Sequence, residues 1–149
     1  TAKQLALEQE ERENNFGVIL ASILVNNFKS YLDPADYSEM KEKIEQYKTT
    51  NDKFRKESLN SDLEDLANQY GVLLNVFLFK VVADSADNPT DAARANAAFD
   101  EMMNELKAGN ISAVRRIQDE NDDLLKKHGT DIGTAFSTTI GSSTTDQNN

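Results

Sequence analysis

The most apolar stretch of the chain runs from residue 70 to residue 83, where the only strongly polar side chains are Asn75 and Lys80. A helix formed by this stretch would be apolar on nearly every side, which is typical of a helix in the middle of a bundle or in a membrane. The stretch is shorter than the ~20 residues that a membrane span needs, and it contains a lysine. We therefore expect a buried central helix and no membrane span.

A second apolar stretch lies near the N-terminus and predicts a helix from about residue 2 to residue 32. Its large side chains recur at spacings of three and four residues, which is the pattern of one helical face. These side chains are Phe16, Leu20, Ile23, Leu24, Phe28 and Tyr31. The helix should end before Asp33-Pro34, because the residue before a proline avoids helical geometry.

The following segment predicts an amphipathic helix that starts at Pro34 with Asp33 as its N-cap. Its apolar stripe contains Tyr37, Met40, Ile44, Tyr47, Asn51 and Phe54. Residues 49–52 have low helix propensity and are a candidate kink or break.

Three more helices complete the prediction. Ser61 and Glu64 have the spacing of a capping box, so a third helix should begin at Ser61 and include the stretch at residues 70–83. Asn88-Pro89 predicts the start of a fourth helix, which reaches about Lys107. A fifth helix runs from about Ser112 to Lys127, and Gly129 is its expected stop.

These patterns predict an all-α fold: a single-domain helical bundle of about five helices. The bundle occupies residues 1–129. Residues 130–149 are rich in Ser, Thr, Gly and Asn, and this composition is typical of a polar tail or linker.

Two short patterns recur along the chain and suggest an internal repeat. Phe16-Gly17-Val18 resembles Tyr70-Gly71-Val72, 54 residues later, and Asp33-Pro34 resembles Asn88-Pro89, 55 residues later. A duplication would give two pseudo-symmetric helical hairpins plus a C-terminal helix, with the two apolar helices paired at the centre and crossing at Gly17 and Gly71. The competing interpretation is that buried helices share a composition, and matches this short are weak.

Composition narrows the partners that the chain can have. With 149 residues it can bury a core without disulfides, and it contains no cysteine. Its net charge of −10 repels nucleic acid phosphates and anionic lipid surfaces. A partner selected by electrostatics would be a basic protein, and the simpler alternative is that the charge only maintains solubility.

The start of the chain bears on its location. Thr1 opens it without a preceding methionine, as cleavage of a signal peptide or trimming would leave it. The absence of cysteine also suits a bacterial exported protein. These features favour a periplasmic or secreted location over a cytoplasmic one.

Residues with the chemistry of a catalytic or metal site are few. The single histidine, His128, lies at a predicted helix end, where a capping role is simpler than a place in a catalytic triad. Residues 119–123 resemble a calcium loop in composition, but Leu124 stands where the sixth-position glycine is needed. No di-iron Glu-x-x-His motif and no phosphate-binding loop is present. We expect no metal and no cofactor.

The function that these observations favour is a non-enzymatic acidic helical interaction module, such as an inhibitor, immunity-type or adaptor protein that binds a basic partner. Its candidate contacts are Tyr37, Tyr47, Phe54, Glu39 and Glu42. The competing interpretation for the three aromatic residues is core packing, because they share a stripe with Ile44. Two other functions remain open: a self-associating homodimeric protein, and a carboxylate- or metal-dependent enzyme.

Overall fold

The chain is built from helices, and the all-α prediction is confirmed. The computed structural model describes residues 2, 15–130, 132 and 133, and these residues contain no strand. Their named elements, in chain order, are α2 (Phe16–Asn27), the 3₁₀ helix η1 (Lys29–Tyr31), α3 (Pro34–Thr49), α4 (Lys53–Asn68), α5 (Gly71–Ser85), α6 (Pro89–Lys107), α7 (Ile111–Glu120) and α8 (Asp122–Lys127).

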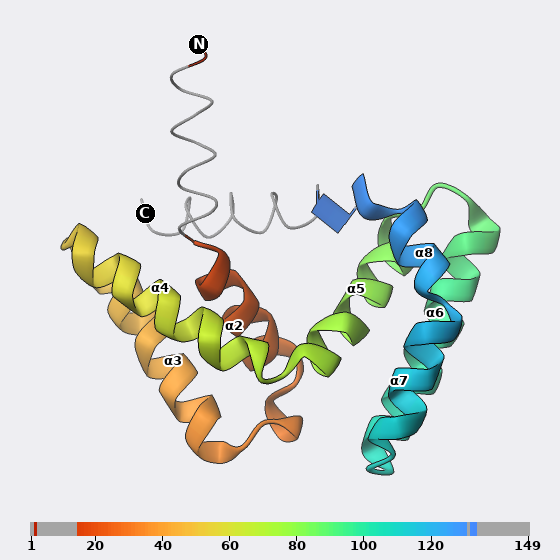
Figure 1. Ribbon diagram of the computed structural model, residues 1–149, viewed down its shortest axis with the longest axis horizontal. Coiled ribbons are helices and arrows are strands. Elements are labelled where there is room, and N and C mark those ends of the chain that lie inside the picture. The colour runs from red at the N-terminus through yellow and green to blue at the C-terminus, as the bar shows by residue number, and fades with distance from the viewer. Residues whose placement is uncertain (1, 3–14, 131, 134–149) are drawn as a thin grey trace. The chain divides into compact units, whose positions relative to one another are not determined.

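The helices form two compact units, and we describe each unit by itself. Unit 1 contains α2, η1, α3 and α4, and its described part ends at Tyr70. Unit 2 begins at Gly71 and contains α5, α6, α7 and α8. Figure 1 shows the elements of each unit.

In unit 1 the apolar helix α2 packs most extensively on α4, and α3 packs on both of them. Its buried side chains include Ile19 and Leu24, which meet a core that contains Met40 of α3 and Leu63 of α4. The sequence patterns predicted α2 and α3 as a hairpin pair, but the main partner of α2 is α4.

The boundaries of α3 and α4 follow from their caps. The Asp33 carboxylate accepts a hydrogen bond from the Ala35 amide at 2.8 Å, so α3 starts where it was predicted to start. The helix ends at Thr49, which confirms the predicted break. Asp52 then caps α4 through the amides of Phe54 and Arg55, at 2.9 and 3.3 Å.

The predicted start of the third helix at Ser61 is wrong. Ser61 lies in the middle of α4 and is exposed, because the Asp52 cap starts this helix two turns earlier. The break falls instead at residues 69 and 70, so the predicted third helix is divided between α4 and α5. The capping-box spacing at Ser61 and Glu64 was therefore misleading.

Gly17 allows a very close approach of two helix backbones within unit 1. A Cβ atom at this position would overlap the backbone oxygen of Asn60 and lie 2.8 Å from the backbone nitrogen of Glu64. The prediction that Gly17 marks a close helix crossing is correct, but the partner is α4. Gly71 does not show the same close approach, because a Cβ at this position would meet nothing within 4 Å.

In unit 2 the apolar helix α5 packs most extensively on α6, and α6 also packs on α7. Val76, Phe79 and Val82 of α5 are fully buried, as a central helix requires. The Asn88 side chain caps α6 through the amides of Thr90 and Asp91, so the predicted start of this helix is confirmed.

The predicted fifth helix is interrupted once. α7 ends at Glu120 and α8 begins at Asp122, with Asn121 between them outside helical geometry. The Asn121 side chain donates to the carbonyl of Ile117 at 2.8 Å, which is an alternative to continuing the helix. Beyond α8, Ile132 packs on a small buried cluster of Val82, Ala95 and Leu124.

The lengths of the helices bear on membrane crossing. Within the described ranges, no single helix is both long enough and apolar enough to cross a membrane. Only α4 and α5 taken as one segment, across the break between them, reach that length and composition.

Candidate interaction surface on α3 and α4

The five residues predicted as partner contacts all lie on α3 and α4 of unit 1, but the structure gives them different environments. Tyr47 is only 6% exposed, and its hydroxyl donates to the side-chain oxygen of Asn15. The ammonium of Lys56 lies 5.1 Å from the centre of its ring. Tyr47 is therefore a core side chain of unit 1.

Tyr37 is half-buried and lies between two open hollows of about 540 and 660 Å³. The linings of the two hollows share Tyr37 and Ser38. The ammonium groups of Lys29 and Lys41 lie 5.1 and 5.7 Å from the centre of the Tyr37 ring, within cation–π range. Two cations therefore accompany this ring.

The two predicted glutamates lie on the exposed side of α3. Glu42 lines the second hollow and accepts a hydrogen bond from the Gln46 side chain at 3.2 Å. Glu39 lies 3.7 Å from the ammonium of Lys43, which also pairs with Asp62 of α4 at 3.0 Å. The structure thus places Glu42 beside Tyr37 and pairs Glu39 with a neighbour on its own helix.

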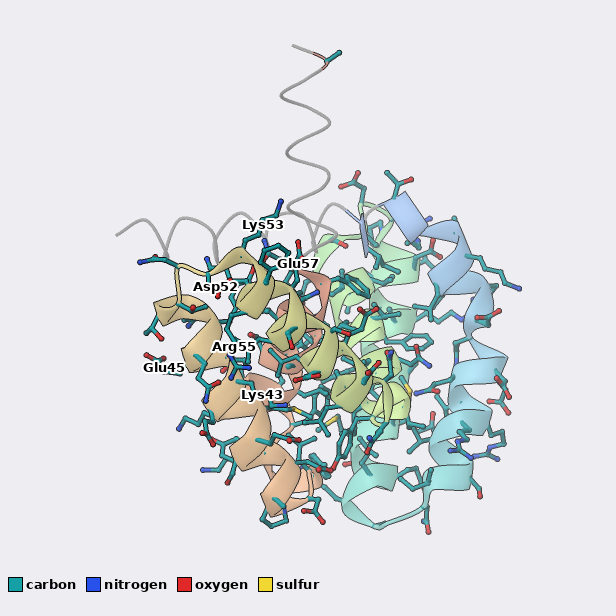
Figure 2. The ribbon with its side chains drawn as sticks, turned by 60° about the vertical axis from the view of Figure 1, so that its left-hand side comes forward. Lys43, Glu45, Asp52, Lys53, Arg55 and Glu57 are labelled. Atoms are coloured by element: carbon teal, nitrogen blue, oxygen red, sulfur yellow. The ribbon has the colours of Figure 1, made fainter. Side chains whose placement is uncertain are left out.

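Phe54 is the most exposed large apolar side chain in the described part of the chain. It is 81% exposed, whereas the next two, Ile111 and Phe16, are 41% and 40% exposed. Phe54 sits in the first turn of α4, where the Asp52 cap fixes the backbone and Lys53 flanks it. Figure 2 labels four charged residues at this end of the helix: Asp52, Lys53, Arg55 and Glu57.

The exposed residues that follow Phe54 form one straight line along α4. They are spaced by three or four residues, so they lie on the face opposite the buried Leu59 and Leu63. We call this line the α4 outer stripe; its residues are Phe54, Ser58, Ser61, Asp65 and Asn68.

The charges on α4 are ordered against the helix dipole. All its basic residues come first, at Lys53, Arg55 and Lys56, and all its acidic residues follow, from Glu57 to Asp65. A helix dipole favours the opposite order, and each such charge near a helix end contributes about 0.3–1 kcal/mol. This order therefore costs α4 stability, and stability alone does not explain it.

The sequence patterns missed this charge order because the helix was expected to begin at Ser61. That boundary placed the basic residues and the acidic residues on different helices. The signal that reveals α4 is Asp52, an N-cap residue directly before the charged segment.

A cluster of polar side chains in unit 2 binds α8 to α6. The Asp91 carboxylate lies 2.8 Å from the Nε2 atom of His128 and 2.7 Å from the ammonium of Lys127. Both Asp91 and His128 are buried. Lys127 and His128 together hold the pKa of Asp91 below its usual value, with Lys127 as the larger cause. His128 takes the C-cap position of α8, as predicted, and joins two helices in addition.

Arg94 makes the second polar link between α6 and α8. Two guanidinium nitrogens donate to the two oxygens of Asp123 at 2.7 and 2.8 Å, and Nε donates to Asn121 at 3.0 Å. The guanidinium lowers the pKa of Asp123. Asp123 thus joins two helices, whereas Asp122 pairs with Lys126 one turn away on α8.

Within the described ranges, no cluster of three or more His, Asp or Glu side chains could hold a metal ion. The comparisons with known proteins add no assignment, because no family model, curated protein or solved structure matches the chain.

Proposed function

We propose that the chain is a non-enzymatic helical interaction module and that the α4 outer stripe is its contact surface for a protein partner with basic side chains. The observation that carries the proposal is Phe54, an aromatic side chain held 81% exposed on a capped helix turn. A large apolar side chain that is exposed to this degree adds little to the stability of the fold. It contributes to the free energy of binding when a partner covers it.

The energy that Phe54 can supply is that of an interface anchor. Burying a phenylalanine side chain contributes about 1.5–3 kcal/mol. Anchors of this kind dominate binding when neighbouring contacts exclude water around them. Ser58 and Ser61 follow Phe54 on the stripe, and their small side chains allow a partner helix to approach α4 closely.

The acidic residues of the surface determine the sign of the charge that a partner must carry. Glu57, Asp62 and Asp65 are exposed along the stripe or directly beside it. No lysine or arginine occurs from Glu57 to Phe79, and Asp62 pairs with Lys43 of α3 at 3.0 Å. Charges at the rim of an interface mainly raise the association rate and select the partner.

A direct test uses a fluorescent amphipathic helical peptide of lysine and leucine as the probe, with fluorescence anisotropy as the readout. We expect binding to the full chain, about tenfold weaker binding to Phe54→Ala, and a loss of affinity as salt is raised. Ile111→Ala in unit 2 is the matched control, because it removes another exposed apolar side chain. Binding that Phe54→Ala and salt leave unchanged would refute the proposal.

A further inference from the structure

We infer that the basic partner of the α4 outer stripe is a second copy of this chain, paired through an antiparallel contact between the two α4 helices. The inference rests on the proposed function, since it names the partner of the same surface. Its observation is the charge order of α4: a basic first turn at Lys53, Arg55 and Lys56, and an acidic remainder.

The charge order of α4 is complementary to that of a second α4 in only one relative orientation of the two helices. When two copies of α4 lie antiparallel, the basic first turn of each faces the acidic second half of the other. Lys53 and Arg55 then meet Asp62 and Asp65 of the partner copy, twice over by symmetry. Such a two-fold contact uses the same surface on both copies and closes on itself.

The same orientation relieves the unfavourable order within each helix. In one isolated α4, acidic residues lie toward the negative end of the dipole and basic residues toward the positive end. In the antiparallel pair, the positive end of one helix lies beside the acidic residues of the other. The charges that destabilise one copy therefore stabilise the dimer.

The shape of the stripe fits a helix partner. α4 has 16 residues and is about 24 Å long. Ser58 and Ser61 lie near its middle, where two helices approach most closely, and Phe54 lies toward its end. In the pair, each Phe54 ring would lie against the second half of the partner copy's α4, which removes both rings from water.

The size of this contact sets the expected affinity. One pair of short helices buries less than the roughly 1,200 Å² of total surface that stable interfaces exceed. We therefore expect a reversible dimer that depends on protein concentration. Its dissociation constant should rise by about tenfold or more between low and high salt, because exposed charges carry it.

The test is sedimentation equilibrium of the full chain over a wide concentration range, with two charge-reversed variants. One variant carries Lys53→Glu and Arg55→Glu, and the other carries Asp62→Lys and Asp65→Lys. Each variant alone places like charges opposite each other, so each should be monomeric. An equal mixture should form a heterodimer, because positions 53, 55, 62 and 65 are then all acidic on one copy and all basic on the other.

The controls separate pairing from folding and from the proposed function. Circular dichroism should show native helix content for each variant, and Asp62→Asn should report the loss of the internal pair with Lys43 alone. Failure of the mixed variants to associate would overturn the inference. If the wild-type chain also stays monomeric yet binds the lysine–leucine peptide through Phe54, the proposed function stands and self-pairing is wrong. If neither binding occurs, both are wrong.

Discussion

Units 1 and 2 begin in the same way and are completed by different means. Each starts with an apolar helix, α2 or α5, and continues with a helix that has proline at its first position and an Asx side chain as its cap. Residues 15–70 and residues 71–130 each contain ten acidic and seven basic residues. The numbers of acidic and basic residues, and therefore the net charge, do not distinguish the two units.

The difference lies in what holds the last named helix of each unit, α4 in unit 1 and α8 in unit 2. In unit 1, α2 and α4 meet backbone to backbone at Gly17, and the buried Asn60 side chain accepts a hydrogen bond from the Val18 amide at 3.1 Å. In unit 2, Asp91 and Arg94 of α6 bind α8 through ion pairs. A close backbone contact holds α4 in unit 1, and ion pairs hold α8 in unit 2, although the first helices of the two units, α2 and α5, are both apolar.

This difference limits what the recurring sequence patterns establish. The repeated Asx-Pro starts are real helix starts, but the apolar helices choose different main partners, α4 for α2 and α6 for α5. A duplication of an ancestral unit stays a prediction. Its two glycines, at least, have separate roles.

The largest expected effect comes from Gly17→Ala. The new methyl group would overlap the Asn60 backbone, and backbone atoms cannot move aside without separating α2 from α4. Alanine gains about 1 kcal/mol in helix propensity, but overpacking at a rigid contact costs more. We expect a net loss of about 2–4 kcal/mol in the free energy of unfolding of unit 1, measured by urea denaturation.

Gly71→Ala is the matched substitution in unit 2. Nothing lies within 4 Å of the new methyl group, so stability should change by less than about 1 kcal/mol. All four tyrosines, Tyr31, Tyr37, Tyr47 and Tyr70, belong to unit 1, so tyrosine fluorescence follows unit 1 while circular dichroism follows both units. Equal effects of the two substitutions would contradict the proposed difference between the units.

The next largest effect should come from Asn60→Ala. The N-cap residue of α2, Asn15, makes no capping bond with its side chain, and Asn60 satisfies a buried amide of the first turn in its place. Leaving the Val18 amide without a partner costs about 1–3 kcal/mol. Asn68→Ala removes an exposed asparagine of the same helix and should change stability by less than about 0.5 kcal/mol. The measurement is the urea midpoint from tyrosine fluorescence, and similar midpoints for both variants would show that Asn60 is not a cap.

Much of the fold could be predicted from sequence because it depends on local signals. The caps at Asp33 and Asn88, and the break after Thr49, are each encoded within a few residues. The apolar stretches identified the buried helices for the same reason. The partner of α2 could not be predicted in this way, since the contact of Gly17 with Asn60 joins positions far apart in the chain.

The candidate site was predicted less completely. Tyr37 and Glu42 line the same hollow, but Tyr47 belongs to the core, although it shares a stripe with Phe54. A periodic pattern does not show at which residue a stripe stops being buried. Here the stripe stops being buried at the end of α3. The charge order of α4 depends on the helix boundary, which the pattern at Ser61 misplaced.

Acid should weaken unit 2 before unit 1. The pKa values of Asp91 and Asp123 are lower in the folded chain than their usual value of 3.8. Their ion pairs therefore stabilise the fold fully above pH 3.8, and this contribution is lost as the pH falls below that value. We expect circular dichroism to lose signal at a higher pH than tyrosine fluorescence does.

The control for acid unfolding is Asp91→Asn. This variant keeps the shape of the side chain but cannot form the ion pair with Lys127 and removes the negative charge beside His128. Unit 2 should be weaker at neutral pH, and its stability should depend less on pH in the acid range. A wild-type acid transition in which both probes coincide would mean that the two units do not differ in this respect.

The smallest expected effect is at the alkaline end and belongs to unit 1. The Tyr70 hydroxyl donates to Asp36 and accepts from the Asp33 amide at 3.1 Å, which joins the end of α4 to the start of α3. Burial, and then the hydrogen bond to Asp36, raise the pKa of Tyr70 above its usual value of 10.0.

Because the folded pKa is the higher one, the neutral hydroxyl stabilises unit 1 fully below pH 10.0, and this contribution is lost as the pH rises through the folded pKa. Tyr70→Phe should lower the free energy of unfolding of unit 1 by about 1 kcal/mol at neutral pH. The stability of unit 1 should then depend less on pH at the alkaline end. The ultraviolet absorbance of tyrosinate should show one fewer late-titrating group in Tyr70→Phe than in the wild-type chain. If the late part of the titration is the same in both proteins, the hydroxyl of Tyr70 is not held neutral by Asp36, and the proposed link between the end of α4 and the start of α3 is wrong.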